Sequence, residues 1–228
     1  MILPENRLYN EPVVCRKRGM SMGRQRRNAY RLKSGQLLLG WVVYFCLYYL
    51  TETCIPEENC HVIYCSLDDW IPFCELFVIF YVGWYGLIAF SLVYFLLRAT
   101  DSFRKLQTYF IVVQMLATVV YILYPSRQEL RPEVFPRENI LTDILTVIYR
   151  VDTPTGICPS LHVALSAGIA SAWLRQKRAK SWLKVVIVLL CLGVCASVIF
   201  VKQHSVLDIL AAVPLCLLAE WLVFIRMA

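Results

Sequence analysis

The sequence lacks several signatures that identify common classes of enzyme. It has no glycine-rich phosphate loop and no Gly-x-Ser-x-Gly segment, so the motifs of P-loop nucleotide hydrolases and of α/β-hydrolases are both missing. None of its 10 cysteines forms a Cys-x-x-Cys pair, which argues against a zinc framework. Most of them lie within apolar segments, where cysteine acts as a small apolar side chain. Cys54, Cys60 and Cys65 share one polar loop, and the sequence leaves open whether two of them form a disulfide.

Charged residues are also scarce. They make up 17% of the 228 residues, whereas 59% are hydrophobic and the mean hydropathy is +0.58. A soluble domain has only about half apolar residues. The apolar residues gather into six runs, each near the roughly 20 residues that cross the hydrocarbon core of a bilayer, at 35–53, 72–97, 106–124, 160–174, 183–201 and 206–225. The sequence therefore predicts an all-α fold, an integral membrane six-helix bundle within residues 35–228.

The net charge of +7 follows from where the basic residues lie, and it does not indicate a nucleic-acid partner. Most of the 23 lysines and arginines lie in residues 1–34, after the second and fourth apolar runs, and at the end of the sequence. The opposite loops hold most of the acidic residues. By the positive-inside rule, we expect a multi-pass protein of the cell membrane with both termini cytoplasmic. Residues 1–34 show no apolar periodicity, so we expect a basic N-terminal tail that is mobile or lies on the membrane surface.

One loop is too long to be a simple connector. Residues 125–158 contain an apolar pattern at helical spacing, formed by Ile140, Leu141, Ile144, Leu145 and Ile148. This pattern predicts a short amphipathic helix on the outer membrane surface. Such a helix either lies beside a functional site or simply covers the bundle, and the sequence leaves both interpretations open.

Two of the three histidines lie beside polar residues at the ends of apolar runs. One of them belongs to the segment Lys202-Gln-His-Ser-Val-Leu-Asp208, between the fifth and sixth runs. If a helix begins near Ser205, then His204 and Asp208 lie on the same side of its first turn. The carboxylate can then fix the tautomer of the imidazole and leave its other nitrogen free to react. The residues from Ser205 to Asp208 are also a capping box, which would simply start the last helix.

The second histidine belongs to Cys158-Pro-Ser-Leu-His162, at the start of the fourth run. Pro159 suits the first position of a helix, so the N–H groups of Ser160, Leu161 and His162 are expected to lack helical partners. Free N–H groups at a helix start bind phosphate well, and Ser160 adds a hydroxyl. An ordinary helix start with an interfacial histidine would have the same sequence.

Together the two segments indicate phosphoryl transfer. In the predicted topology, Arg131 and Lys202 lie at the same outer ends of the helices as His162, His204 and Asp208. One imidazole can attack phosphorus while the other protonates the leaving oxygen. The cations and the free N–H groups can stabilise the charge on the transferring phosphoryl group.

At these segments the chain resembles the type 2 phosphatidic acid phosphatase superfamily. Pro159-Ser-Leu-His162 is similar to the Pro-Ser-Gly-His motif of that family, and His204-Ser-Val-Leu-Asp208 is similar to its His-x-x-x-Asp motif. Arg131-Pro132 is similar to the Arg-Pro that ends the first motif of the family. The resemblance covers roughly residues 35–225 and implies a six-helix bundle with an outward-facing active site that uses no metal or other cofactor.

The resemblance also implies roles for individual residues. His204 would be the nucleophile that forms a phosphohistidine, Asp208 its partner and His162 the acid. Arg131 and Ser160 would bind phosphate.

The chain departs from the family motifs at three positions. Tyr124 stands where the first motif usually has a lysine, Val198 where the third motif usually has an arginine, and Leu161 where the second motif has a glycine. Two phosphate-binding cations are therefore missing, and Lys202 and Arg127 are the available substitutes. We also expect the N–H group of Leu161 to contribute to phosphate binding.

The sequence thus predicts a metal-independent lipid phosphate phosphatase that hydrolyses a lipid phosphate or a prenyl diphosphate at the outer leaflet. Three other interpretations stay open. A lipid head-group phosphotransferase of the sphingolipid or inositol-phospholipid synthase type would share these residues but need a pocket for an acceptor alcohol. His162, His204 and Asp208 could instead form a metal centre. A catalytically inactive scaffold or transporter would explain the missing cations. Membrane lipids are the other expected partners, and the identity of the lipid and the oligomeric state stay open.

Overall fold

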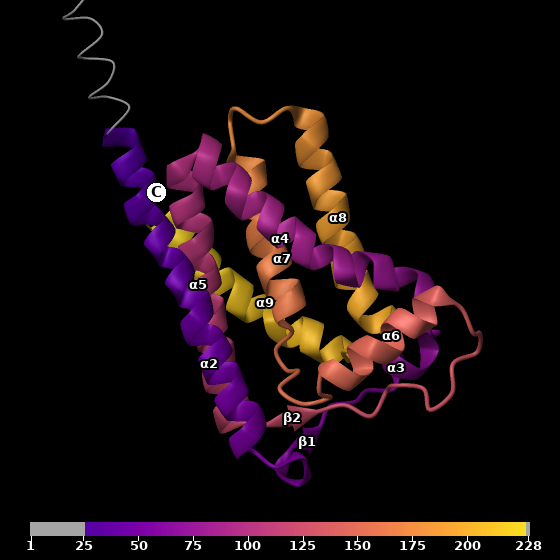
Figure 1. Ribbon diagram of the computed structural model, residues 1–228. Helices are drawn as coiled ribbons and strands as arrows, with labels where there is room; N and C mark the ends of the chain where they lie inside the picture. Colours follow the sequence, from indigo (N-terminus) through magenta and orange to yellow (C-terminus); the bar gives the residue numbers. More distant parts are fainter. Residues whose placement is uncertain (1–25, 227–228) are drawn as a thin grey trace, which may run out of the picture.

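The computed structural model describes residues 26–226, which are mostly helical (Figure 1). The first helix extends from residue 26 through η1 (Gln36–Leu38) and α2 (Leu39–Cys54). The other long helices are α4 (Val78–Arg98), α5 (Thr100–Leu123), α7 (Leu161–Arg175), α8 (Ser181–Phe200) and α9 (Val206–Glu220), which continues into the π-helical η4 (Trp221–Ile225). The short elements between them are η2 (Glu57–Asn59), β1 (His61–Val62), α3 (Leu67–Trp70), η3 (Glu75–Phe77), β2 (Ser126–Arg127) and α6 (Ile140–Val151). The predicted helical fold and the predicted helix over residues 140–148 are confirmed.

Five helices in the described part of the chain are long and apolar enough to cross a membrane, namely Arg26–Cys54, Glu75–Arg98, Thr100–Leu123, Ser181–Phe200 and Val206–Ile225. They correspond to five of the six predicted runs. The remaining run corresponds to α7, which has 15 residues. A helix of that length rises about 22 Å, less than the hydrocarbon core of about 30 Å.

The first helix begins earlier than the apolar pattern predicts. Residues 26–34 were expected in the basic tail, but they are helical. They are held by polar contacts, since the Tyr30 hydroxyl donates to Asp101 Oδ1 at 2.8 Å and Arg31 donates to the Leu97 carbonyl at 2.5 Å. Hydrophobic periodicity does not reveal a helix whose contacts are polar. The rest of the predicted tail, residues 1–25, lies outside the described residues.

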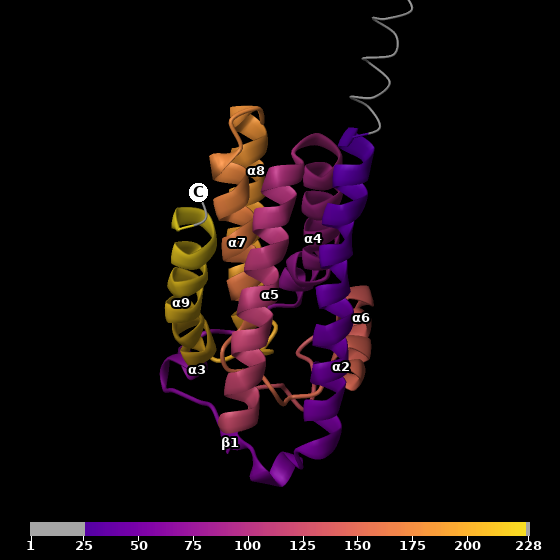
Figure 2. The ribbon, with the colours of Figure 1, turned by 90° about the vertical axis from the view of Figure 1, so that its left-hand side faces the viewer.

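Successive long helices run in opposite directions, so their connections collect at two ends of the bundle (Figures 1 and 2). One end holds the start of the first helix, the α4–α5 and α7–α8 connections, and the last described residues. The other end holds the connections that precede α4, α7 and α9, together with α3, α6 and the two short strands. The basic connections therefore lie at one end of the bundle and both histidine segments lie toward the other.

Helix α7 is the centre of the bundle, where it packs against α4, α5, α8 and α9. The Trp173 side chain is fully buried, and its Nε1 donates to Ser91 Oγ on α4 at 3.0 Å. Gly168 lies so close to α5 that a Cβ there would be 2.4 Å from the ring of Tyr109, which is why this contact requires glycine. The helix that carries His162 is therefore tightly held by its neighbours.

Helix α2 is attached much more loosely. None of the residues in its most apolar window is buried within the protein. Its contact with α5 includes Trp41 Nε1, which donates to Gln107 Oε1 at 3.2 Å. At its other end, Glu52 accepts a hydrogen bond from Thr155 Oγ1 at 2.9 Å and another from Thr153. A cavity described below separates α2 from α4 between these two attachments.

The connections at the histidine end are tied to one another. Strands β1 and β2 pair in parallel, with His61 opposite Ser126. Asn139 caps α6 through a capping box with Thr142.

Cys54, Cys60 and Cys65 are free thiols, so the disulfide that the sequence leaves open is not formed in this structure.

Candidate active site

His204 lies in the short connection between α8 and α9. Its Nδ1 is 3.1 Å from Oδ2 of Asp208, in the first turn of α9. The same Oδ2 accepts a hydrogen bond from the Ser205 N–H group at 2.9 Å, which is half of a complete capping box. Asp208 is fully buried. The capping box is therefore present, and the same carboxylate also contacts the histidine, as the spacing predicts. Nε2 of His204 is left as the ring nitrogen that can act on a substrate.

Asp68 of α3 fixes this connection from outside the helix. Its carboxylate accepts hydrogen bonds from Ser205 Oγ at 2.6 Å and from the N–H groups of Val206 and Cys65 at 2.8 and 2.9 Å. Burial raises the pKa of Asp68, but these hydrogen bonds outweigh burial and hold the pKa below its usual value. A carboxylate at this helix start is also favoured by the helix dipole. No sequence pattern singles out Asp68 as part of this site, because it lies 137 residues before Ser205.

The His162 ring, in the first turn of α7, faces His204. The two ring centroids are 5.6 Å apart and the rings are inclined at 69°. Trp84 and Tyr81 of α4 flank His162 at centroid distances of 4.2 and 4.6 Å. Nε2 of His162 is buried and has no hydrogen-bond partner within residues 26–226. The structure thus brings together the two histidines that the sequence predicts to act together.

The start of α7 differs in detail from the prediction. Ser160 is the N-cap, and the helix begins at Leu161, so Pro159 lies before the helix and not at its first position. The N–H group of Ser160 is not free, because it donates to the carbonyl of Asp208 at 3.1 Å. Leu161 and the residue after it still have N–H groups without intrahelical partners. Ser160 Oγ is fully buried and has no partner within the described residues.

Arg131 does not contact either histidine. Its Nε and Nη2 donate to Oε1 of Gln203 at 3.1 and 2.6 Å, and its remaining bonds go to the carbonyls of Tyr149 and Asp152 at 3.0 and 2.8 Å. Its guanidinium also lies over the Tyr149 ring, 4.7 Å from the centroid. Burial lowers the pKa of Arg131, although an arginine stays charged. It forms no ion pair within residues 26–226, and all of its hydrogen bonds go to neutral oxygens. The negative charge nearby is that of Asp152, which favours the charged form of the guanidinium.

Gln203 is the residue through which Arg131 reaches the site. Because a guanidinium can only donate, it fixes the amide of Gln203 with the oxygen toward Arg131. Nε2 of Gln203 is left buried and without a partner in the described part of the chain. Gln203 lines the same cavity as the two histidines. Sequence reasoning missed this residue, for which the only signal was its place next to His204.

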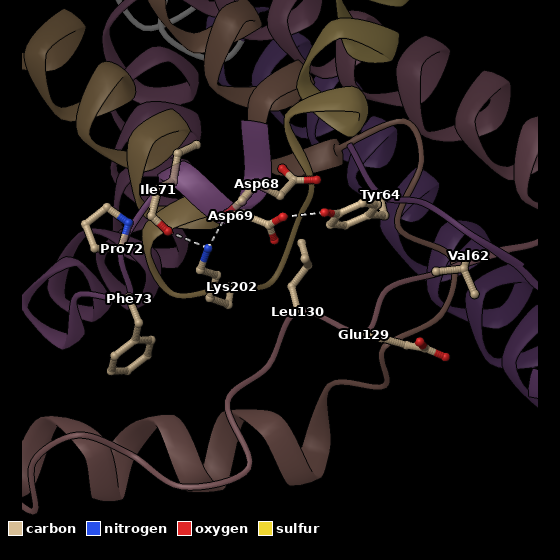
Figure 3. Close-up of a pocket in the computed structure, with 10 residues that line it drawn as sticks. All are labelled: Val62, Tyr64, Asp68, Asp69, Ile71, Pro72, Phe73, Glu129, Leu130 and Lys202. Carbon is tan, nitrogen blue, oxygen red and sulfur yellow. Dashed lines mark hydrogen bonds between the residues drawn. The ribbon is translucent and has the colours of Figure 1, made fainter. Parts of the chain in front are cut away.

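Lys202 is directed away from the histidines. It has a φ of 56° and ends α8 in a Schellman-type turn, in which the Gln203 N–H group donates to the Val198 carbonyl at 2.9 Å. Its ammonium donates to the carbonyls of Asp68 and Ile71 at 2.7 and 2.6 Å, in a separate cavity of about 580 Å³ (Figure 3). The expectation that Lys202 lies at the phosphate is therefore not met, because these two carbonyls hold its side chain on the α3 side.

Arg127, the other candidate to replace the missing cations, is also held elsewhere. It forms an ion pair with Glu129 and lies 3.9 Å from a carboxylate oxygen of Glu57. Among residues 26–226, no lysine or arginine lines the cavity that contains the histidines.

This cavity has a volume of about 570 Å³, and His162, Gln203 and His204 lie at its polar end. The rest of its wall consists mainly of aromatic and aliphatic side chains from α2, α4 and the start of α7. Along the first helix the wall extends from Leu38, at the end of η1, to Tyr48 of α2, which is about 15 Å at about 1.5 Å per residue. One leaflet of the hydrocarbon core has the same depth, about half of 30 Å. The cavity therefore suits one apolar chain whose polar end lies at the histidines.

Two other chemistries fit the site less well. Burial and the neighbouring Asp208 carboxylate raise the pKa of the Cys158 thiol to about 12, so this thiol stays protonated and is a poor nucleophile. Within residues 26–226, no three His, Cys, Asp or Glu side chains are grouped so that they could hold a metal ion. The proposed metal centre of His162, His204 and Asp208 is therefore not supported by the geometry.

Comparison with known proteins gives one match. The family model of the PAP2 superfamily matches residues 104–228, which contain both histidine segments and Arg131. No curated protein and no solved structure matches the chain.

Proposed function

This chain belongs to the PAP2 superfamily, and from that premise we propose that it is a membrane phosphatase that hydrolyses a lipid phosphate or a prenyl diphosphate. One observation carries the proposal. His204 is paired with Asp208 at 3.1 Å and faces His162 at the polar end of an apolar cavity.

In the first step, Nε2 of His204 forms a bond to phosphorus while the bond between phosphorus and the lipid oxygen breaks. Asp208 keeps the proton of His204 on Nδ1, so that Nε2 has a lone pair for the attack. His162 gives its proton to the leaving oxygen, and the departing group is the lipid alcohol for a lipid phosphate or the prenyl monophosphate for a prenyl diphosphate. The products of this step are a phosphohistidine at His204 and a neutral His162.

In the second step, water attacks phosphorus and the bond to His204 breaks. His162 now accepts the proton of the water, which restores the starting protonation state and releases inorganic phosphate. The close packing of His162 between Trp84 and Tyr81 favours this double role, because it holds one ring position through both steps.

The charge on the transferring phosphoryl group is met by neutral donors, since no lysine or arginine in the described part of the chain lines the cavity. The amide of Gln203 supplies N–H donors, and its contact with the Arg131 guanidinium polarises them. The N–H groups at the start of α7 add the positive end of a helix dipole. The buried hydroxyl of Ser160 has no other partner and can also donate.

The apolar part of the substrate lies in the cavity between α2 and α4. We further propose that α7 is a sixth, short membrane helix, that both termini are cytoplasmic and that the histidines face the outer side of the cell membrane. The basic connections at the opposite end of the bundle support this orientation.

Phosphate release by the purified protein in liposomes tests the proposal. The substrates are a long-chain lipid phosphate, a prenyl diphosphate and a short water-soluble phosphate ester. We expect release from a long-chain substrate by the wild-type protein and none from His204→Ala. No release from any of these esters, or equal release by His204→Ala, would contradict the proposal.

A substitution that fills the cavity tests where the chain binds. Ala89 of α4 lines the cavity, so Ala89→Trp should lower turnover of long-chain substrates about tenfold or more and leave the short ester unchanged. Gly86→Trp is the matched control on the same helix, because a Cβ at Gly86 meets nothing within 4 Å. Equal effects of the two substitutions would show that the chain binds elsewhere.

A further inference from the structure

Trp84 of α4 carries a hydrogen-bond donor for which the described part of the protein supplies no acceptor. Its side chain is only 7% exposed, and its Nε1 is buried without a hydrogen-bond partner within residues 26–226. An indole nitrogen can only donate, and a buried tryptophan usually finds an acceptor because an unpaired buried donor is costly. The acceptor of Trp84 is therefore expected to come from a bound molecule.

The other tryptophans that pack within the bundle do have acceptors. Nε1 of Trp173 donates to Ser91 Oγ at 3.0 Å, and Nε1 of Trp41 donates to Gln107 Oε1 at 3.2 Å. The remaining three tryptophans are exposed, namely Trp70, Trp182 and Trp221. The unpaired buried donor thus distinguishes Trp84 from its counterparts in this fold.

Trp84 lies at the polar end of the cavity. It lines the cavity together with His162 and Gln203, and each of these two also has a buried nitrogen without a partner in the described part of the chain. The centroid of the Trp84 ring is 4.2 Å from that of His162, and His162 faces His204 at 5.6 Å. Unpaired nitrogens gathered beside one cavity indicate an occupant that is rich in acceptors.

A transferring phosphoryl group is the part of the proposed substrate with the most acceptors. Its charge spreads over three equatorial oxygens, and hydrogen bonds to charged oxygens are stronger than those to neutral ones. The donors assigned above come from α7 and from the connection that precedes α9, whereas Trp84 belongs to α4. Its ring packs against His162 while its N–H group lies in the ring plane, so one side chain can hold His162 and donate at the same time.

We propose that Trp84 is a catalytic residue whose Nε1–H group donates to a non-bridging oxygen of the phosphate at His204. This inference rests on the proposed function and adds a contact to it. The N–H proton stays on the indole throughout, and the hydrogen bond strengthens as negative charge develops on the oxygens in the transition state. A neutral donor thereby takes over part of the role of the missing cations.

The test removes the N–H group without changing the shape of the ring. Benzothienylalanine has the same bicyclic shape as tryptophan with sulfur in place of the N–H group, so it keeps the packing against His162. Trp84→benzothienylalanine should lower kcat/KM by about 10- to 100-fold, the usual cost of one hydrogen bond to a charged group. The loss should be the same for a long-chain lipid phosphate and for a short water-soluble phosphate ester, because both present the same phosphate. The pH dependence of kcat/KM should stay unchanged, since the histidines are not altered.

Trp173→benzothienylalanine is the matched control, because Nε1 of Trp173 donates to Ser91 and Trp173 does not line the cavity. It should reduce thermal stability and change kcat/KM by less than about threefold. Equal losses of kcat/KM in the two variants would overturn the inference.

Three further outcomes are decisive. Wild-type kcat/KM in Trp84→benzothienylalanine would overturn the inference while the proposed function stands, because the role of Trp84 would then be packing alone. A loss confined to the long-chain substrate would also overturn it, since the N–H group would then serve the lipid and not the phosphate. Failure of the wild-type protein to release phosphate from any ester would overturn both.

A spectroscopic measurement does not depend on turnover. The chain has 6 tryptophans, so protein labelled with ¹⁵N at the indole nitrogens gives 6 indole N–H signals, and Trp84→Phe identifies the one from Trp84. Orthovanadate, which mimics five-coordinate phosphorus, should move the Trp84 proton signal downfield by more than any of the others. An unmoved Trp84 signal at a concentration of orthovanadate that inhibits phosphate release would overturn the inference.

Discussion

The substitution Asp208→Asn separates the two roles that the structure gives to one carboxylate. Oδ2 of Asp208 accepts from Nδ1 of His204 and from the N–H group of Ser205. Asparagine keeps an oxygen that can accept from Ser205, so the start of α9 should still form. Because the same oxygen also faces Nδ1 of His204, an asparagine that caps the helix still accepts the ring proton, but it lacks the negative charge that stabilises this histidine as it attacks phosphorus.

The expected effect on catalysis is large, while the effect on stability is small. Substituting the aspartate that orients a catalytic histidine by asparagine costs about 10⁴-fold in kcat in the serine protease triad, where the tautomer of the histidine changes as well. Here the tautomer can be kept and the charge is lost, so we expect a smaller loss of about 10²- to 10³-fold in kcat. The free energy of unfolding should fall by no more than about 2 kcal/mol, because the cap is retained and one hydrogen bond to a charged group is weakened.

The assay combines phosphate release with thermal unfolding of the purified protein. Asp68→Asn is the control, since Asp68 caps the same helix through Ser205 and Val206 but does not contact His204. It should reduce thermal stability and leave kcat within about tenfold of wild type. A kcat of Asp208→Asn within tenfold of wild type would refute the reasoning, and so would a loss of activity that merely follows unfolding in both variants.

Four other predictions follow from the geometry. Gln203→Leu removes the amide donors from the cavity and should lower kcat about 10²- to 10³-fold in the phosphate-release assay, which is the usual cost of losing one oxyanion donor. An unchanged kcat would show that Gln203 takes no part in the mechanism. Lys202→Met removes two hydrogen bonds to carbonyls, so it should lower the free energy of unfolding by about 1–3 kcal/mol and change kcat by less than about threefold. A large loss of kcat without a loss of stability would show that Lys202 acts in catalysis. Because the pKa of Asp68 is lowered in the folded protein, its stabilising contribution should be complete above about pH 4 and should decrease as the pH falls further. The thermal stability of Asp68→Asn should therefore depend less on acid pH than that of the wild-type protein. An equal dependence in both proteins would contradict this assignment. Cysteines introduced at Lys177 and Glu133, both exposed, should react with an impermeant reagent from opposite sides of the membrane, and labelling from one side would contradict the topology.

Local patterns were enough to predict much of the fold and the centre of the site. Hydropathy located five helices long enough to span a membrane, because apolar residues in such a helix need only face lipid or one another. The pair of His204 and Asp208 was predictable because both residues belong to one helix start, where the spacing fixes their relation. The approach of His162 to His204 followed once both were assigned to the same end of the bundle.

Contacts between distant loops could not be predicted in this way. Lys202 looked like a phosphate ligand because it is two residues from His204, but its positive φ and the carbonyls of the α3 segment place its ammonium in another cavity. The placement of Gln203 depends on Arg131, which lies 72 residues earlier. No sequence pattern singled out Asp152, which lines the cavity and accepts a hydrogen bond from Tyr81, 71 residues earlier.

The central claim is that His204 is the residue that carries the phosphoryl group. Its most direct test is to mix the purified protein with a lipid phosphate labelled on phosphorus, quench within one turnover, and identify the labelled residue by mass spectrometry under conditions that preserve phosphohistidine. The account predicts one label, on His204, that is absent from His204→Ala and that accumulates to lower levels in Asp208→Asn. Label on another residue, or hydrolysis by a fully active protein without any labelled intermediate, would contradict it.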